Sequence, residues 1–191
     1  HLRRARERFE PLGNAMEMAS TLDAQGRVES DVGRHAAAIA TYRESLAWAR
    51  RSQANGALES AIRLHLAELL LSMGRTLDAE EEMRRAEQLA IAHHASGRLV
   101  RIYVLMGILR GREGDEAGFV FFEQALALCR TFERPPALEA EVYRQYGQFK
   151  HRLGQGQEAV AFLERAQELF EVAGGGASLE RVRAELDELS A

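Results

Sequence analysis

The sequence predicts an all-α protein, an α-solenoid made of antiparallel helix hairpins. One pattern of glycine, small and large apolar residues recurs along the chain at a spacing of about 40 residues. The 191 residues include only 3 prolines, at positions 11, 135 and 136, which leaves long stretches free for helices. No segment alternates apolar and polar residues with the period of a strand. Because a single hairpin cannot bury its own apolar face, we expect neighbouring hairpins to stack.

The repeat is marked by four glycines that are 41, 40 and 40 residues apart, namely Gly33, Gly74, Gly114 and Gly154. In three copies, alanine follows the marker at +5, a large apolar residue at +9, and alanine or serine at +12; the Gly114 copy is one residue shorter. A small residue lies seven positions before each marker, at Gly26, Ala67, Gly107 and Gly147. We expect the marker glycine to end the first helix of each hairpin, helix A, and to turn the chain into helix B. The large residue at +9 is expected to fill the gap between neighbouring hairpins.

These signals divide the chain into successive elements. Residues 1–12 are expected to form the second helix of a truncated upstream repeat, because Ala5 to Gly13 resembles Ala166 to Gly174 in residue type. This similarity predicts more repeats, or a different domain, upstream of His1. Four hairpins are predicted at 14–53, 55–94, 96–133 and 135–173. Residues 177–190 are expected to form a C-terminal capping helix with Ser178 as its N-cap, which brings the total to about ten helices.

In these slots the sequence resembles the tetratricopeptide repeat family. That family has a small residue at its eighth position, a turn glycine near the fifteenth, alanine at the twentieth, an aromatic residue at the twenty-fourth and alanine at the twenty-seventh. The first copy fills these slots with Gly26, Gly33, Ala38, Tyr42 and Ser45. The period is longer than the usual length of about 34 residues and is similar to the longer variant in bacterial signal-transduction ATPases, transcriptional activators and scaffold proteins. The resemblance implies a right-handed solenoid whose A helices line a concave groove.

The resemblance also implies which side chains face that groove. By register, the expected partner-binding residues are Asp23, Arg27 and Asp31; Leu64, Glu68 and Leu71; Arg101, Val104, Ile108 and Arg112; and Arg144, Gln148 and Arg152. This surface runs from mixed charge through an apolar middle to a basic end, which suits an acidic partner segment with apolar anchors. The asparagine and lysine pattern with which some family members clamp a C-terminal carboxylate is absent.

Motifs for catalysis are absent from the sequence. There is no phosphate-binding glycine loop with a lysine, since Lys150 is the only lysine, and there is no glycine-x-serine-x-glycine elbow. We therefore expect no enzyme activity, no cofactor and no metal. The adjacent His93 and His94 are interpreted as a polar helix end and Cys129 as a buried thiol. The aromatic residues Phe119, Phe121 and Phe122 are interpreted as core packing rather than as a base-stacking platform.

Charge and composition narrow the function classes. With 25 basic and 29 acidic residues the net charge is −4, which gives no general attraction to nucleic acid or to an anionic membrane. The single cysteine fits a reducing compartment, so a cytoplasmic protein is expected. The predicted function is a protein-interaction module, the C-terminal part of a larger bacterial regulatory protein, with its upstream domain as one partner and self-association open. One alternative is a receptor for a small peptide or metabolite that changes the superhelix pitch. A second alternative is an RNA-binding α-solenoid.

Overall fold

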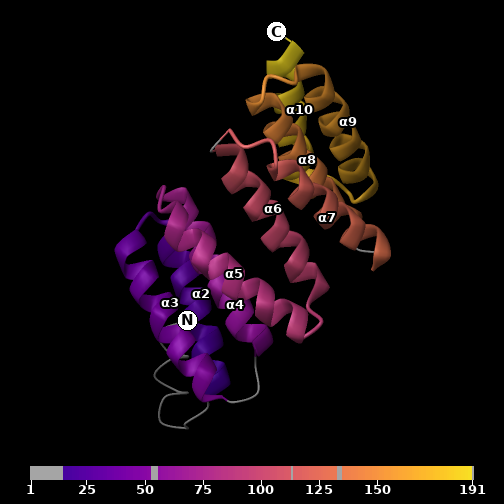
Figure 1. Ribbon diagram of the computed structural model, residues 1–191. Coiled ribbons are helices and arrows are strands. Elements are labelled where there is room, and N and C mark those ends of the chain that lie inside the picture. The colour runs from indigo at the N-terminus through magenta and orange to yellow at the C-terminus, as the bar shows by residue number, and fades with distance from the viewer. Residues whose placement is uncertain (1–14, 53–55, 113, 133–134, 191) are drawn as a thin grey trace. The chain divides into compact units, whose positions relative to one another are not determined.

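The computed structural model describes residues 15–52, 56–112, 114–132 and 135–190, and within these ranges the chain is helical and has no strand. The helices are α2 (Ala15–Asp31), α3 (His35–Arg51), α4 (Gly56–Ser72), α5 (Thr76–Ala92), α6 (Ser96–Arg112), α7 (Gly118–Thr131), α8 (Pro136–Arg152), α9 (Gly156–Val172) and α10 (Gly176–Ser190) (Figure 1). The predicted all-α fold of a helical-repeat solenoid is confirmed. The helix predicted for 1–12 lies outside the described residues.

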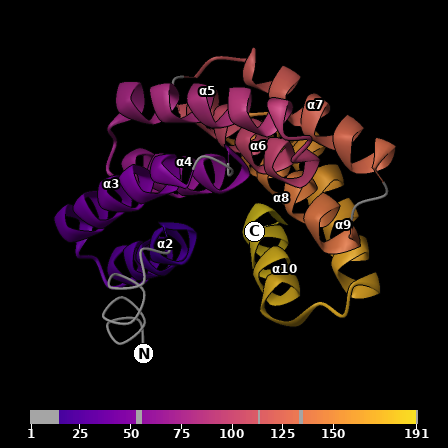
Figure 2. The same cartoon turned by 90° about the horizontal axis from the view of Figure 1, so that it is seen from below.

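The helices pack as hairpins in chain order, and the chain forms two compact units. The first unit ends at Arg98 and the second begins at Leu99, so the boundary lies in the first turn of α6. In the first unit α2 packs with α3, α4 packs with α5, and α3 also contacts α4. In the second unit α7 packs with α8, α8 with α9 and α9 with α10; Figure 2 shows the short connection from α9 to α10.

The marker glycines end helix A as predicted, because each adopts a conformation that L side chains rarely take. Gly33 has φ of 77° and Gly154 has φ of 76°. In the first hairpin the Arg34 N–H donates to the Glu29 carbonyl at 2.8 Å and the Gly33 N–H donates to the Ser30 carbonyl at 3.0 Å. This pair of bonds is the Schellman motif, which satisfies the last carbonyls of the helix.

Three turns differ in detail from the repeat pattern. The turn between α5 and α6 lies at the predicted boundary of the second and third hairpins, but His94, not glycine, adopts the positive φ there, at 52°. Helix α7 begins only at Gly118, four residues after the marker Gly114. The capping helix begins at Gly176, so Ser178 lies inside it and is not its N-cap. Backbone hydrogen bonds close the turns after α5 and α9.

The small residue of helix A and the large residue of helix B touch within the same hairpin. A Cβ atom on Gly107 would lie 2.5 Å from Cε2 of Phe122, and one on Gly26 would lie 2.7 Å from Cε1 of Tyr42. The aromatic ring therefore occupies the space that a larger residue on helix A would need. The large residue was predicted to fill a gap between hairpins, but it also packs against the small residue within its own hairpin.

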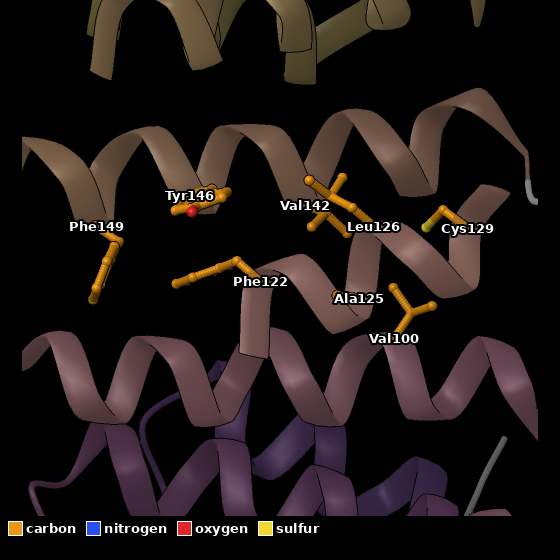
Figure 3. Packing of buried hydrophobic residues seen from close by; sticks show 8 residues of the cluster. All are labelled: Val100, Phe122, Ala125, Leu126, Cys129, Val142, Tyr146 and Phe149. Atoms are coloured by element: carbon orange, nitrogen blue, oxygen red, sulfur yellow. The ribbon is translucent and has the colours of Figure 1, made fainter. Parts of the chain in front are cut away.

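The core of the second unit shows the packing between hairpins. Phe122 of α7 stacks on Tyr146 of α8 at a centroid distance of 4.9 Å and an interplanar angle of 9°. Phe149 of α8 also contacts the Phe122 ring, at a centroid distance of 5.3 Å. Figure 3 shows Phe122 directed toward Tyr146 and Phe149, with the Cys129 thiol buried in the same cluster. The large residue thus joins its own hairpin to the next one.

The capping helix buries the stripe that the sequence indicates. Val182 is fully buried against Leu163, Ala166 and Phe170 of α9, and Leu179, Leu186 and Leu189 pack around this cluster. The opposite side of α10 carries exposed charged residues, among them Glu180 and Arg181.

Candidate binding surfaces

Four of the predicted groove residues gather in the first unit around the buried ring of Tyr42. Asp23, Arg27 and Asp31 lie on α2 and Glu68 lies on α4, and all four act electrostatically on the phenol. Burial raises the pKa of Tyr42, and the carboxylates of Asp23, Glu68 and Asp31 raise it further, while Arg27 lowers it. Three carboxylates against one guanidinium give this surface a negative potential.

His65 belongs to the same surface, although the sequence pattern did not indicate it. Its Nδ1 lies 2.8 Å from Oδ1 of Asp23, and its ring centroid lies 6.4 Å from that of Tyr42. The side chains of His65 and Asp23 are only 12% and 13% exposed, so this contact joins α2 to α4 at the floor of the surface. We name Asp23, Arg27, Asp31, His65 and Glu68 the α2–α4 face.

The apolar middle of the predicted groove is interior. Leu64 and Leu71 of α4 are 1% and 2% exposed, so neither side chain is open to a partner. Val104 and Ile108 of α6 are half-buried and pack against the aromatic cluster of the second unit. These leucine, valine and isoleucine side chains were assigned to the groove by register, and burial removes Leu64 and Leu71 from it.

One arginine of the predicted basic end, Arg144, is neutralised within the second unit. Arg144 is 5% exposed, and its guanidinium donates to Glu141 at 2.6 Å and to Glu185 of α10 at 2.7 Å. Its expected role as an open basic contact is therefore wrong, because α10 covers it with a carboxylate. Arg101 is exposed on α6.

A pocket of about 280 Å³ lies in the second unit between α8, α9 and α10. Its lining residues, which we name the α8–α10 pocket, are Gln148, His151, Arg152, Leu163, Glu185, Glu188 and Leu189. Gln148 and Arg152 are predicted groove residues, and the structure brings them together here. Partial burial lowers the pKa of the Arg152 guanidinium, and the nearby charge of Arg112 lowers it further.

Glu185 is the member of this pocket that sequence reasoning missed. Its Oε1 accepts hydrogen bonds from Gln148 Nε2 and from Arg144 Nη1, both at 2.7 Å, while its buried Oε2 has no hydrogen-bond partner. Because one oxygen accepts from both donors, the other oxygen has unused acceptor capacity. No motif marks Glu185, because its partners lie about 40 residues away on another helix.

A cleft of about 300 Å³ on α3, α4 and α5 contains five arginines, yet most of them already have acidic partners. Arg50 and Arg63 contact Glu59, Arg75 contacts Asp78, and Arg85 contacts Glu81. Only Arg43 makes no ion pair in the part of the chain that the structure describes. The cleft is therefore a network of ion pairs in which most arginines are already neutralised, so it has little charge left to attract an anion.

The remaining candidates have structural roles or none. Cys129 is buried, as predicted. Phe122 is core, but Phe119 is 46% exposed, so the prediction of core packing fails for that residue. His93 and His94 are exposed at the end of α5, as expected for a polar helix end. In the described ranges, no group of three or more His, Cys, Asp or Glu side chains is arranged to hold a metal ion.

No family model matches the chain, and no curated protein matches it. Among solved structures, the chain is similar to BtubC (BKLC) from P. vanneervenii, with 16% sequence identity and a TM-score of 0.70. The match covers 99% of this chain and 88% of that one. At this identity the similarity concerns the fold alone. Within the described residues, none of the helices combines the length and the apolar character that crossing a membrane requires.

Proposed function

We propose that this chain is a protein-interaction module of the tetratricopeptide type, and that its α2–α4 face binds a segment of a partner protein. The observation that carries the proposal is the convergence of Asp23, Asp31 and Glu68 with Arg27 around Tyr42. These side chains come from two successive A helices, as the resemblance to the repeat family implies. Such a surface has a fixed floor and charged side chains at its rim, which is how interaction surfaces are commonly built.

The charge of this face selects the chemistry of the partner. Three carboxylates and one guanidinium attract a segment that carries a lysine or an arginine. Asp31 and Arg27 are exposed, so both can contact an arriving side chain. Asp23 is held by His65 at 2.8 Å and acts as a fixed part of the floor. The acidic partner expected from the basic end has less support, because Arg144 is paired within the chain.

A selection from a random peptide library displayed on phage tests this function, because it surveys many partner sequences at once. We expect the selected peptides to share a basic residue, and their affinity to fall as salt is raised, since exposed charges are screened. Asp31→Asn and Glu68→Gln, which remove charge at nearly constant shape, should each weaken the best peptides by about tenfold or less, as expected for partly exposed charge contacts.

The control removes a carboxylate of the same unit outside the face. Glu87→Gln on α5 makes the same change of charge in the chain, and its peptide affinity should match the unsubstituted protein. A selection that yields no binding peptides, or peptides whose affinity is the same for all three variants, contradicts the proposal. Circular dichroism of each variant verifies that the helices are retained.

A further inference from the structure

The α8–α10 pocket contains two groups of opposite charge whose binding capacity is not used. Oε2 of Glu185 is buried and accepts no hydrogen bond. The guanidinium of Arg152 has no acidic partner within the described residues, although it lines the same pocket as two glutamates. A buried acceptor without a donor costs free energy, so native proteins seldom retain one without a reason.

The surroundings of Arg152 strengthen this point. Its nearest charged neighbour in electrostatic effect is another cation, Arg112 of α6. A Cβ atom on Gly111 of α6 would lie 3.6 Å from Nη2 of Arg152, so the guanidinium is held against a helix backbone. A cation beside a second cation, and partly desolvated, gains when an anion arrives between or beside them.

The two charged sides are joined by an apolar wall. Leu163 of α9 is buried and Leu189 of α10 is half-buried, and both line the pocket. The volume of about 280 Å³ is just below the usual range for small-molecule pockets, which is about 300–1,000 Å³. A ligand of this pocket is thus small, carries an anionic and a cationic group, and has an apolar part.

We propose that the α8–α10 pocket binds a free α-amino acid with an apolar side chain. Its ammonium group lies beside the carboxylates of Glu185 and Glu188, which both line the pocket. Its carboxylate accepts hydrogen bonds from the guanidinium of Arg152, next to His151. Its side chain lies against Leu163 and Leu189. This site is in the second unit and shares no residue with the α2–α4 face, so it stands or fails independently of the proposed protein interaction.

Calorimetric titration of the whole chain with each of the common L-amino acids tests the proposal. We expect at least one apolar amino acid to bind with a Kd between about 1 µM and 1 mM, a range suited to so small a ligand. For that amino acid, the α-amide, which lacks the carboxylate, and the N-acetyl derivative, which lacks the ammonium charge, should each bind at least about tenfold more weakly.

The decisive variant is Arg152→Gln. Because Arg152 has no acidic partner within the described residues and lies beside Arg112, its replacement should leave the melting midpoint unchanged or raise it, while amino-acid affinity falls at least about tenfold. Arg181→Gln, on α10 but outside the pocket, is the matched control and should bind as the unsubstituted chain does. Glu185→Gln should also weaken amino-acid binding, but it removes an ion-pair partner of Arg144 as well. Arg152→Gln is therefore the more direct test.

Two results overturn the proposal. One is the absence of any heat of binding for every amino acid at concentrations up to about 10 mM, which corresponds to no useful affinity. The other is binding that survives Arg152→Gln or that the α-amide and N-acetyl derivatives reproduce in full. Neither result bears on peptide binding at the α2–α4 face, which uses α2 and α4 only.

Discussion

Arg144 on α8 donates to Glu185 on α10, 41 residues later, with 2.7 Å between Nη1 and Oε1. In the first unit Asp23 on α2 contacts His65 on α4, 42 residues later, at 2.8 Å. Both contacts join an A-type helix to the helix one repeat further on. The acidic residue lies on the earlier helix in the first unit and on the later helix in the second unit. The cap helix α10 therefore supplies to α8 the kind of contact that a further repeat would supply.

This relationship predicts that Arg144 contributes to stability rather than to partner binding. Arg144→Glu brings a third carboxylate beside Glu141 and Glu185 and removes the cation that pairs with both of them. Breaking a buried pair in this way should cost at least about 2 kcal/mol of the free energy of unfolding. Arg43→Glu, an equivalent reversal at an exposed arginine of α3 that makes no ion pair within the described residues, should change it by less than about 0.5 kcal/mol. Urea denaturation of both variants measures the difference, and equal midpoints would contradict the pairing.

The turn between α5 and α6 predicts a stabilising substitution. His94 has φ of 52°, a conformation that costs a residue with a Cβ atom about 1–2 kcal/mol. His94→Gly removes this strain but makes the unfolded chain more flexible, so we expect a net gain of about 0.5–1 kcal/mol. Gly174→Ala, at φ of 86° in the turn after α9, is the reverse experiment and should lose about 1 kcal/mol. Thermal unfolding monitored by circular dichroism distinguishes the two, and a loss of stability in His94→Gly would show that the imidazole has contacts of its own.

These turns also show which parts of the fold were predictable from sequence. Gly33, Gly74 and Gly154 marked their turns because glycine is the residue that adopts positive φ without strain. His94 makes the same turn, but its residue type gives no such signal. The start of α7 was missed for a related reason, since the Asp115 carboxylate closes that turn by accepting from the Ala117 N–H at 2.9 Å.

The candidate sites were less predictable than the fold. Register assigned Asp23, Asp31 and Glu68 to one face, and the structure brings them together around Tyr42. Register could not show that Arg144 is covered, because the covering Glu185 lies on a helix whose angle to α8 is set by packing. The unused oxygen of Glu185 is a property of a three-dimensional hydrogen-bond network, and no local pattern encodes it.

The buried tyrosines predict a loss of stability at alkaline pH. Burial raises the pKa of Tyr42 and of Tyr146 in the folded chain, and nearby carboxylates raise both further. A group whose pKa is raised by folding stabilises the fold at pH below its unfolded value, about 10 for tyrosine, and this contribution is lost as the pH rises above it. The free energy of unfolding should therefore fall above about pH 10. Tyr42→Phe should reduce that slope, as urea midpoints at a series of pH values would show. A slope that Tyr42→Phe leaves unchanged would assign the alkaline loss to other groups.

The contact between Gly107 and Phe122 predicts a substitution that one further change repairs. Gly107→Ala adds a methyl group 2.5 Å from the Phe122 ring, and overpacking of this kind costs about 1–3 kcal/mol, partly offset by the better helix propensity of alanine. The second hairpin shows a natural solution, because alanine at the same position, Ala67, coexists with the flexible Met83 in place of an aromatic ring. In a Phe122→Met background, Gly107→Ala should therefore cost at least about 1 kcal/mol less than in the unsubstituted chain, as a double-mutant cycle by urea denaturation would measure.

Gly156→Ala, where the added methyl group meets nothing within 4 Å, is the control and should not destabilise the chain. Strict additivity of the two core substitutions would mean that the ring and the glycine do not constrain one another.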